Sequence, residues 1–166
     1  MTDEDLPPAL AAIARDLASL PAEERVQLLV ELGDELPDPP ERLRVEPGLL
    51  EAVRECQSPI YVRAEVGPAG GGSPTPDGAA GSAVDGSAVD VVHLHVSAPP
   101  QAPVTRGFAG LLHAGVDGRP VDEVLALPAD LPARLSLEGI VSPLRLRGMA
   151  GLLARVQRQV AEATGR

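Results

Sequence analysis

The spacing of apolar residues changes along the chain from a helical period to a strand period and back. Apolar residues recur every three or four positions over residues 10–17 and 26–33, as in helices with one buried face. Apolar and polar residues instead alternate over residues 60–66 and 90–98, which is typical of strands. Helical spacing returns after Pro103. Strands followed mostly by helices predict an α+β fold, with a small antiparallel sheet covered by several helices.

The start of the last helix has the clearest local signal. Ser142 is a favoured N-cap residue, and Pro143 suits the first helical position because its missing N–H is not needed there. Upstream, the pattern predicts one helix over residues 103–116 and two short helices near residues 120–127 and 131–137. The C-terminal half of the chain is therefore expected to be helical.

A low-complexity segment separates the two predicted strands. Residues 67–90 are rich in Gly, Ala, Ser, Pro and Asp, and the sequence GSAVD occurs at both 81–85 and 86–90. Such a segment has no bulky apolar group whose burial would offset the entropy of ordering it. We therefore predict one domain over residues 1–166, with a flexible insertion at about 67–90.

Composition and charge exclude several classes of function. The formal net charge is -10, which opposes binding to nucleic-acid phosphates. No apolar run reaches the length of a membrane span, and the first residues are acidic where a secretory signal would be basic. The hydrophobic content of 44% suffices for a core, although its aromatic members are only Tyr61 and Phe108. We expect a cytoplasmic protein that binds neither nucleic acid nor membrane.

The chain has a single cysteine, Cys56, which is its strongest nucleophile. It lies between a short segment over residues 49–54, which we interpret as helix or turn, and the strand that follows. Buried free cysteines are common, so Cys56 could simply be a small core residue. The adjacent Gln57 and Ser58 are polar, and connections between elements usually run over the surface, which favours an accessible thiol. Glu55 should raise the thiol pKa and Arg54 should lower it.

Arg145 occupies the first turn of the last helix, where a cation opposes the helix dipole. Such an arginine either projects harmlessly into solvent or helps to bind an anion at the helix N-terminus. Gly148 follows one turn later and lowers helix stability relative to alanine. Close packing or the approach of a partner would explain why a glycine stands there.

Two histidines, His93 and His95, share one face of the second strand and form a candidate metal pair. No third ligand stands at a suitable spacing, so we interpret them as ordinary strand residues and expect no metal. The sequence also lacks a phosphate-binding loop, a nucleophile elbow, a zinc-protease motif and a CxxC motif. Catalysis by this chain alone is therefore not expected.

Three short stretches follow one another along the chain: ELGDELP at residues 31–37, CQS at residues 56–58 and SPLRLRG at residues 142–148. Taken together in this order, they resemble the SufE family of sulfur acceptors in iron–sulfur cluster assembly. The resemblance extends over about residues 8 to 162 apart from the insertion. It implies the fold that this family shares with IscU-type scaffold proteins, including a third short strand that we place around residues 43–46.

The resemblance also implies a function and its partners. A SufS-like cysteine desulfurase, which carries pyridoxal phosphate, would pass sulfur to Cys56 as a persulfide and be stimulated in doing so. The carrier would then deliver the sulfur to a SufBCD-like cluster scaffold. By position, Cys56 corresponds to the persulfide carrier, and Arg145, Gln57, Ser58 and Gly148 to residues that contact partners. The chain itself is expected to be monomeric and to need no cofactor.

Three positions depart from the family pattern. Glu55 stands where a glycine commonly precedes the cysteine, and Gln101 stands where some members have an acidic residue. The aromatic residues usual ahead of the SPxRxxG element are missing around residues 131–134.

Other readings of the sequence remain open at this point. A stand-alone thiol enzyme, either a sulfurtransferase or a peroxide-reducing catalyst, would need a strongly lowered thiol pKa. A scaffold that holds its own iron–sulfur cluster would need more ligands than one cysteine. A purely structural interaction module would leave Cys56 unreactive.

Overall fold

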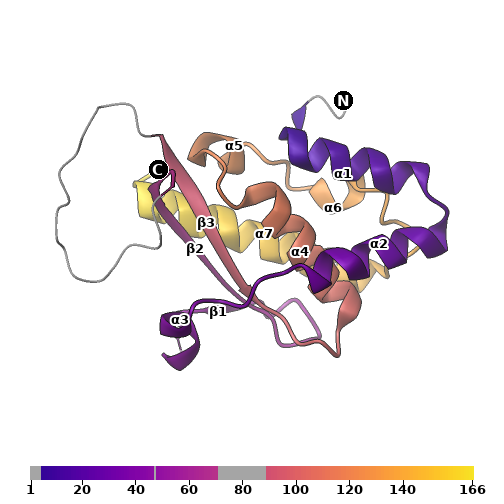
Figure 1. Ribbon diagram of the computed structural model, residues 1–166, viewed down its shortest axis with the longest axis horizontal. Helices are drawn as coiled ribbons and strands as arrows, with labels where there is room; N and C mark the ends of the chain where they lie inside the picture. The colour runs from indigo at the N-terminus through magenta and orange to yellow at the C-terminus, as the bar shows by residue number, and fades with distance from the viewer. Residues whose placement is uncertain (1–4, 47, 71–88) are drawn as a thin grey trace.

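The sheet has three antiparallel strands in the order β1-β2-β3. The strands are β1 (Glu51–Ala52), β2 (Tyr61–Pro68) and β3 (Asp90–Ser97). The computed structural model describes residues 5–46, 48–70 and 89–166 of the chain (Figure 1). The long strands β2 and β3 pair along their whole length, with Val62 opposite Val96. The predicted α+β class is confirmed.

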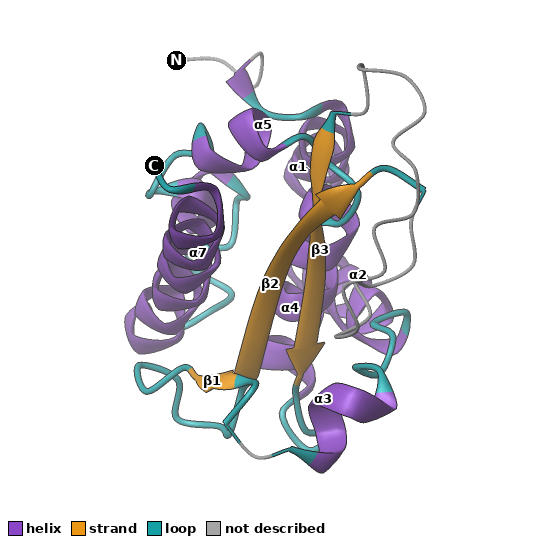
Figure 2. Ribbon diagram, turned by 90° about the vertical axis from the view of Figure 1, so that its left-hand side faces the viewer, coloured by secondary structure: helices purple, strands orange, loops and turns teal. Residues whose placement is uncertain are grey.

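Seven helices within the described residues cover one face of this sheet or lie at its ends. Their bounds are α1 (Pro8–Ser19), α2 (Ala22–Asp34), α3 (Glu41–Val45), α4 (Pro103–Val116), α5 (Val121–Leu125), α6 (Leu131–Arg134) and α7 (Pro143–Thr164). Helix α7 packs against β2 and helix α4 against β3, while α1 and α2 pack on α4. The opposite face of the sheet is turned toward the viewer in Figure 2, with α3 beside its lower end.

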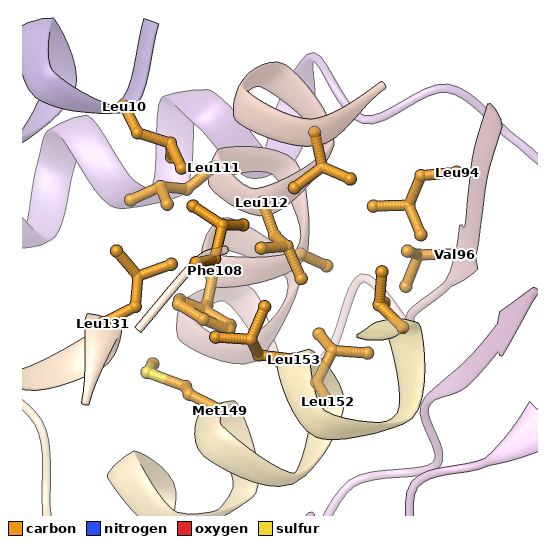
Figure 3. Packing of buried hydrophobic residues seen from close by; sticks show 14 of the residues in the cluster. Leu10, Leu94, Val96, Phe108, Leu111, Leu112, Leu131, Met149, Leu152 and Leu153 are labelled. Carbon is orange, nitrogen blue, oxygen red and sulfur yellow. The ribbon is translucent and has the colours of Figure 1, made fainter. Parts of the chain in front are cut away.

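The core lies between the sheet and the helices α4 and α7. Leu94 and Val96 of β3 face Phe108 and Leu112 of α4, and Leu152 of α7 reaches the same space (Figure 3). These residues are almost fully buried. Phe108 is the one aromatic residue among them, and aliphatic side chains fill most of the interior, as the composition predicted. Tyr61, which was also expected in the core, is instead 41% exposed.

Helices α2 and α4 approach closely because glycines line their contact. A β-carbon on Gly107 would lie 2.2 Å from the carbonyl oxygen of Leu29, and one on Gly110 would lie 1.9 Å from that of Leu32. No larger residue fits at either position without a shift of the backbone. The glycines of α4 thereby bring α2 against the helix that lines the candidate site described below.

The predicted position of the third strand was wrong. Residues 43–46 belong mostly to helix α3 or follow it, and the short strand β1 lies at Glu51–Ala52. Glu51 pairs with Val62, and Ala52 pairs with Tyr61. Prolines immediately precede Glu41 and favour a helix start there, since proline fits the N-terminal positions of a helix. The helix or turn predicted over residues 49–54 was correspondingly wrong at residues 51 and 52.

The predicted low-complexity insertion overlaps both long strands at its ends. Gly67 and Pro68 belong to β2, and Asp90 begins β3. The interior of the insertion, residues 71–88, lies outside the described residues. Among the described helices, none is both long enough and apolar enough to cross a membrane.

Candidate functional site

Cys56 lies in the connection between β1 and β2. Val53 donates its backbone N–H to the carbonyl of Ile60 over 2.9 Å and thereby closes the base of this connection. Within it, the Cys56 N–H donates to the carbonyl of Val53 over 3.2 Å. Val53 and Ile60 are buried, whereas Cys56 itself is half-buried. We call residues 54–59 the Cys56 loop.

The N-terminus of α7 lies beside this loop, and its sequence signal was read correctly. The Ser142 hydroxyl accepts a hydrogen bond from the Arg145 N–H over 3.3 Å, and Pro143 is the first helical residue. This cap fixes where the helix begins. The Arg145 side chain is exposed, while Gly148, one turn later, is buried.

A small cavity of about 40 Å³ adjoins the thiol. Its walls come from the Cys56 loop, from α4 and from the first turns of α7. It is lined by Cys56, Gln57, Ser58, Ile60, Thr105, Phe108, Leu144, Arg145, Gly148, Met149 and Leu152. One side is therefore polar and includes a guanidinium, and the other is the apolar edge of the core. All five residues that the sequence singled out as site residues line this one cavity.

Two glycines of α7 allow the loop to come close to the helix. A β-carbon on Gly148 would lie 2.9 Å from the sulfur of Cys56, and one on Gly151 would lie 3.1 Å from the carboxyl carbon of Glu55. Because the two glycines are three residues apart, they share one face of the helix. They form a shallow notch in α7 in which the Cys56 loop rests.

Arg155, one turn beyond the notch, joins the loop and β1 to α7. Its Nη1 lies 2.6 Å from Glu55 Oε2, and its Nε lies 3.3 Å from Glu51 Oε1. Only 16% of the Arg155 side chain is exposed, compared with 47% for Glu55. The Glu55 carboxylate also accepts a hydrogen bond from its own backbone N–H; this bond and Arg155 hold its pKa below the usual range.

Gln159, one turn further along α7, hydrogen-bonds the edge of β2 just beyond the point where β1 ends. Its side-chain oxygen accepts the backbone N–H of Ala64 over 2.7 Å, and its amide nitrogen donates to Glu51 Oε2 over 2.9 Å. Gln159 therefore supplies to β2 a ladder hydrogen bond beyond the two residues of β1. Hydrogen bonding by Gln159 contributes most to the lowered pKa of Glu51, and Arg158 lowers it further.

The surroundings of Cys56 favour the neutral thiol. Burial raises the pKa of Cys56, and the Glu55 carboxylate raises it further, while Arg155 opposes both effects. A thiol enzyme acting alone requires the opposite shift, because the thiolate is the nucleophile. In this conformation the sulfur is sheltered rather than activated.

The sequence did not reveal the residues that hold the loop in place. Glu55 was identified as a group that raises the thiol pKa and as a departure from the family pattern, but not as a residue that holds the loop, and Gly151 and Arg155 were not identified at all. A signal for the last two was present, since Gly148, Gly151 and Arg155 recur at three- and four-residue spacing on one helix face. Gln101, the second departure, is exposed in the turn before α4 and does not line the cavity.

The strand histidines lie away from this cavity. His95 packs on the outer face of the sheet with its Nε2 3.3 Å from Glu65 Oε2, and Arg42 binds the same carboxylate. Burial lowers the pKa of His95 despite the neighbouring Glu65. In the described part of the chain, no three His, Cys, Asp or Glu residues gather closely enough to hold a metal ion.

The third departure concerns the segment ahead of α7. Leu131, which starts α6, is buried in the core, so an aliphatic residue occupies the region where the resemblance led us to expect aromatic ones.

Comparison with known proteins agrees with this arrangement. Residues 11–73 and 83–160 match the family model described as SufE, an Fe-S metabolism associated domain. An uncharacterized SufE-like protein of Mycobacterium tuberculosis is 39% identical over 158 residues, covering 95% of both chains. A SufE-like protein of Arabidopsis thaliana, chloroplastic and mitochondrial, is 38% identical over 56 residues, which is 34% of this chain and 15% of that protein.

The fold is also found in a solved structure. The solution structure of a hypothetical protein from Thermus thermophilus superposes with a TM-score of 0.72 at 34% identity, covering 97% of this chain and 99% of the other. The resemblance first noted in three short stretches thus extends over sequence and fold together. The chain belongs to the SufE family of proteins associated with iron–sulfur metabolism.

Proposed function

We propose that this protein is a sulfur carrier, in which Cys56 accepts a sulfur atom from a cysteine desulfurase and passes it to a cluster scaffold. The observation that carries the proposal is the cavity in which the single thiol adjoins both a guanidinium and an apolar wall. Membership of the SufE family supports the same pathway. The desulfurase would hold the pyridoxal phosphate, so the carrier needs no cofactor of its own.

The transfer is an exchange at sulfur. The Cys56 thiolate attacks the outer sulfur of a persulfide on the desulfurase, a new S–S bond forms to Cys56, and the old S–S bond breaks. The desulfurase cysteine leaves as a thiolate, so no external oxidant or reductant is needed. A second exchange of the same kind moves the sulfur to a thiol of the scaffold and restores Cys56.

The raised thiol pKa fits a carrier better than an independent catalyst. Burial keeps Cys56 neutral in the free protein, so it reacts slowly with oxidants and with other thiols. Docking on the desulfurase would supply both orientation and a high effective concentration of the persulfide. The protein would therefore act as an accessory that stimulates the desulfurase by removing its product sulfur.

The charges around the cavity indicate how a partner docks. Arg145 lines the cavity, and Arg54 in the Cys56 loop and Arg147 in the first turns of α7 are also exposed. The ion pairs found within the described residues involve other arginines. The chain as a whole has a net charge of -10, whereas these three guanidinium groups place positive charge on the surface around the Cys56 loop and the start of α7. We propose that a desulfurase presents acidic groups to this surface, and that the encounter takes place in the reducing cytoplasm.

Mass spectrometry of Cys56 tests the proposal. After incubation with a pyridoxal-phosphate cysteine desulfurase and free cysteine, the peptide containing Cys56 should gain the mass of one sulfur atom. The Cys56→Ser variant should fold but neither gain sulfur nor accelerate the desulfurase. If the wild-type peptide gains no sulfur while the desulfurase turns over and Cys56 remains alkylatable, the proposed function is wrong.

A further inference from the structure

Arg155 is the side chain that ties the Cys56 loop to the body of the protein. It lies in the middle of α7, and its guanidinium reaches Glu55 in the loop over 2.6 Å and Glu51 in β1 over 3.3 Å. Glu51 has further partners in Gln159 and Arg158. Glu55 has an ion pair with Arg155 alone among the described residues.

Few other polar interactions connect the loop to the rest of the protein. Its base is closed by the Val53–Ile60 hydrogen bond, which lies outside residues 54–59. The notch beneath it consists of Gly148 and Gly151, which offer no side chain for the loop to pack on. The Cys56 side chain packs against the edge of the hydrophobic core, and a cavity of about 40 Å³ remains beside the thiol. Besides the backbone hydrogen bond from Cys56 to Val53, the ion pair is therefore the main polar link between the loop and α7.

We propose that Arg155 is a positioning residue, and that its ion pair with Glu55 is a latch that keeps Cys56 sheltered against α7 until a partner docks. When the pair opens, the loop moves off the glycine notch and the sulfur becomes accessible. The idea that this opening exposes Cys56 for sulfur transfer rests on the proposed carrier function. The latch itself is a property of the free protein.

A purely electrostatic role for the pair predicts a different outcome from a latch. Three groups with defined charge face the thiol, namely Glu55 from the loop, Arg155 from the middle of α7 and Arg145 from its first turn. If Arg155 acted on Cys56 only through its charge, its removal would raise the thiol pKa and slow alkylation. If Arg155 holds the loop closed, its removal exposes the thiol and speeds alkylation.

The latch and the purely electrostatic role are distinguished by the rate at which iodoacetamide alkylates Cys56, measured across pH on the free protein. The plateau reached at high pH reports access to the thiolate, and the midpoint reports the thiol pKa. For Arg155→Gln and for Glu55→Gln we expect the plateau to rise about three- to fivefold, in keeping with a partly exposed ion pair. Arg155→Lys should stay close to wild type because it retains the charge.

Arg158→Gln is the matched control, since Arg158 lies on the same helix and pairs with Glu51 and Glu162 but not with the loop. Its plateau should equal that of wild type. An unchanged or lower plateau in both Arg155→Gln and Glu55→Gln would overturn the latch. Glu55 is substantially exposed, so Glu55→Gln decides the matter even if Arg155→Gln fails to fold.

The carrier function and the latch can fail independently. Alkylation needs no partner, so it tests the latch even if wild-type Cys56 accepts no sulfur from a desulfurase. If Cys56 does accept sulfur, Glu55→Gln should accept it faster than wild type at low desulfurase concentration. If Glu55→Gln is alkylated faster but accepts sulfur no faster than wild type, the latch is confirmed but does not control sulfur transfer.

Discussion

Gly148 and Cys56 are in contact across the boundary between α7 and the Cys56 loop. A β-carbon on Gly148 would lie 2.9 Å from the Cys56 sulfur and 3.4 Å from the Cys56 α-carbon. The absence of a side chain at this helix position is therefore what allows the thiol to rest beside the cavity. Sequence reasoning identified both residues separately and gave close packing as one explanation of the glycine, and the structure supplies the contact that joins them.

Substitution of Gly148 by alanine should displace the thiol while leaving the fold intact. The added methyl group forces the sulfur or the loop backbone to move, whereas the helix gains about 1 kcal/mol of intrinsic stability. We expect Gly148→Ala to increase the rate of Cys56 alkylation several-fold with little loss in the free energy of unfolding. Ala154→Gly, at an exposed position on the same helix, controls for helix propensity, and equal alkylation of Gly148→Ala and wild type would contradict the contact.

Gln159 should matter for stability more than any exposed polar residue of α7. The residue is 8% exposed, and its side-chain oxygen accepts the backbone N–H of Ala64 in the sheet. Gln159→Leu would leave that N–H unpaired, at a cost of about 2 kcal/mol. Urea unfolding measures the loss, with Gln27→Leu as a control on an exposed helix face. A change within about 0.5 kcal/mol, the usual range for surface substitutions, would show that water replaces the amide.

The parts of the fold that sequence reasoning predicted correctly have local signals. Ser142 and Pro143 mark the start of α7, and the alternation over β2 and β3 is long enough to be recognised. Strand β1 has only two residues, so no alternation can reveal it. It exists because Glu51 bonds to Gln159 and pairs with Val62, and these contacts are made only in the folded chain.

The candidate site shows the same division. Cys56, Arg145 and Gly148 were proposed as site residues from short, contiguous motifs, and the structure places all three around one cavity. The Arg155–Glu55 pair joins residues far apart in the sequence, and local charge patterning can predict only pairs three or four residues apart. Nor could the direction of the Cys56 pKa be predicted, because the neighbouring Arg54 and Glu55 oppose each other and the decisive effect is burial.

Arg145 should affect partner binding without affecting stability. Its side chain is exposed beside the cavity, so Arg145→Ala should change the free energy of unfolding by less than about 0.5 kcal/mol. Under the proposed function, the same variant should bind the desulfurase more weakly, with a smaller salt dependence of the association rate. Arg15→Ala, on the exposed face of α1, should leave both quantities unchanged. If Arg145→Ala binds the desulfurase as tightly as wild type does, Arg145 has no role in partner binding.

His113 should make the protein less stable in mild acid. It lies near the end of α4 with only 22% of its side chain exposed, and burial lowers its pKa although Asp117 is 3.9 Å away. Because the folded pKa is below the ordinary value of about 6.5, the unfolded chain binds more protons in the interval between them. The contribution of neutral His113 to the free energy of unfolding is therefore fully present above about pH 6.5 and is lost as the pH falls through the folded pKa.

His113→Gln should flatten the dependence of unfolding free energy on pH between about 5 and 7, by at most about 1.4 kcal/mol per pH unit. Ala114→Gln, at the exposed neighbouring position, should keep the wild-type slope, and an equal slope in all three proteins would mean that His113 is protonated as readily in the fold as in the unfolded chain.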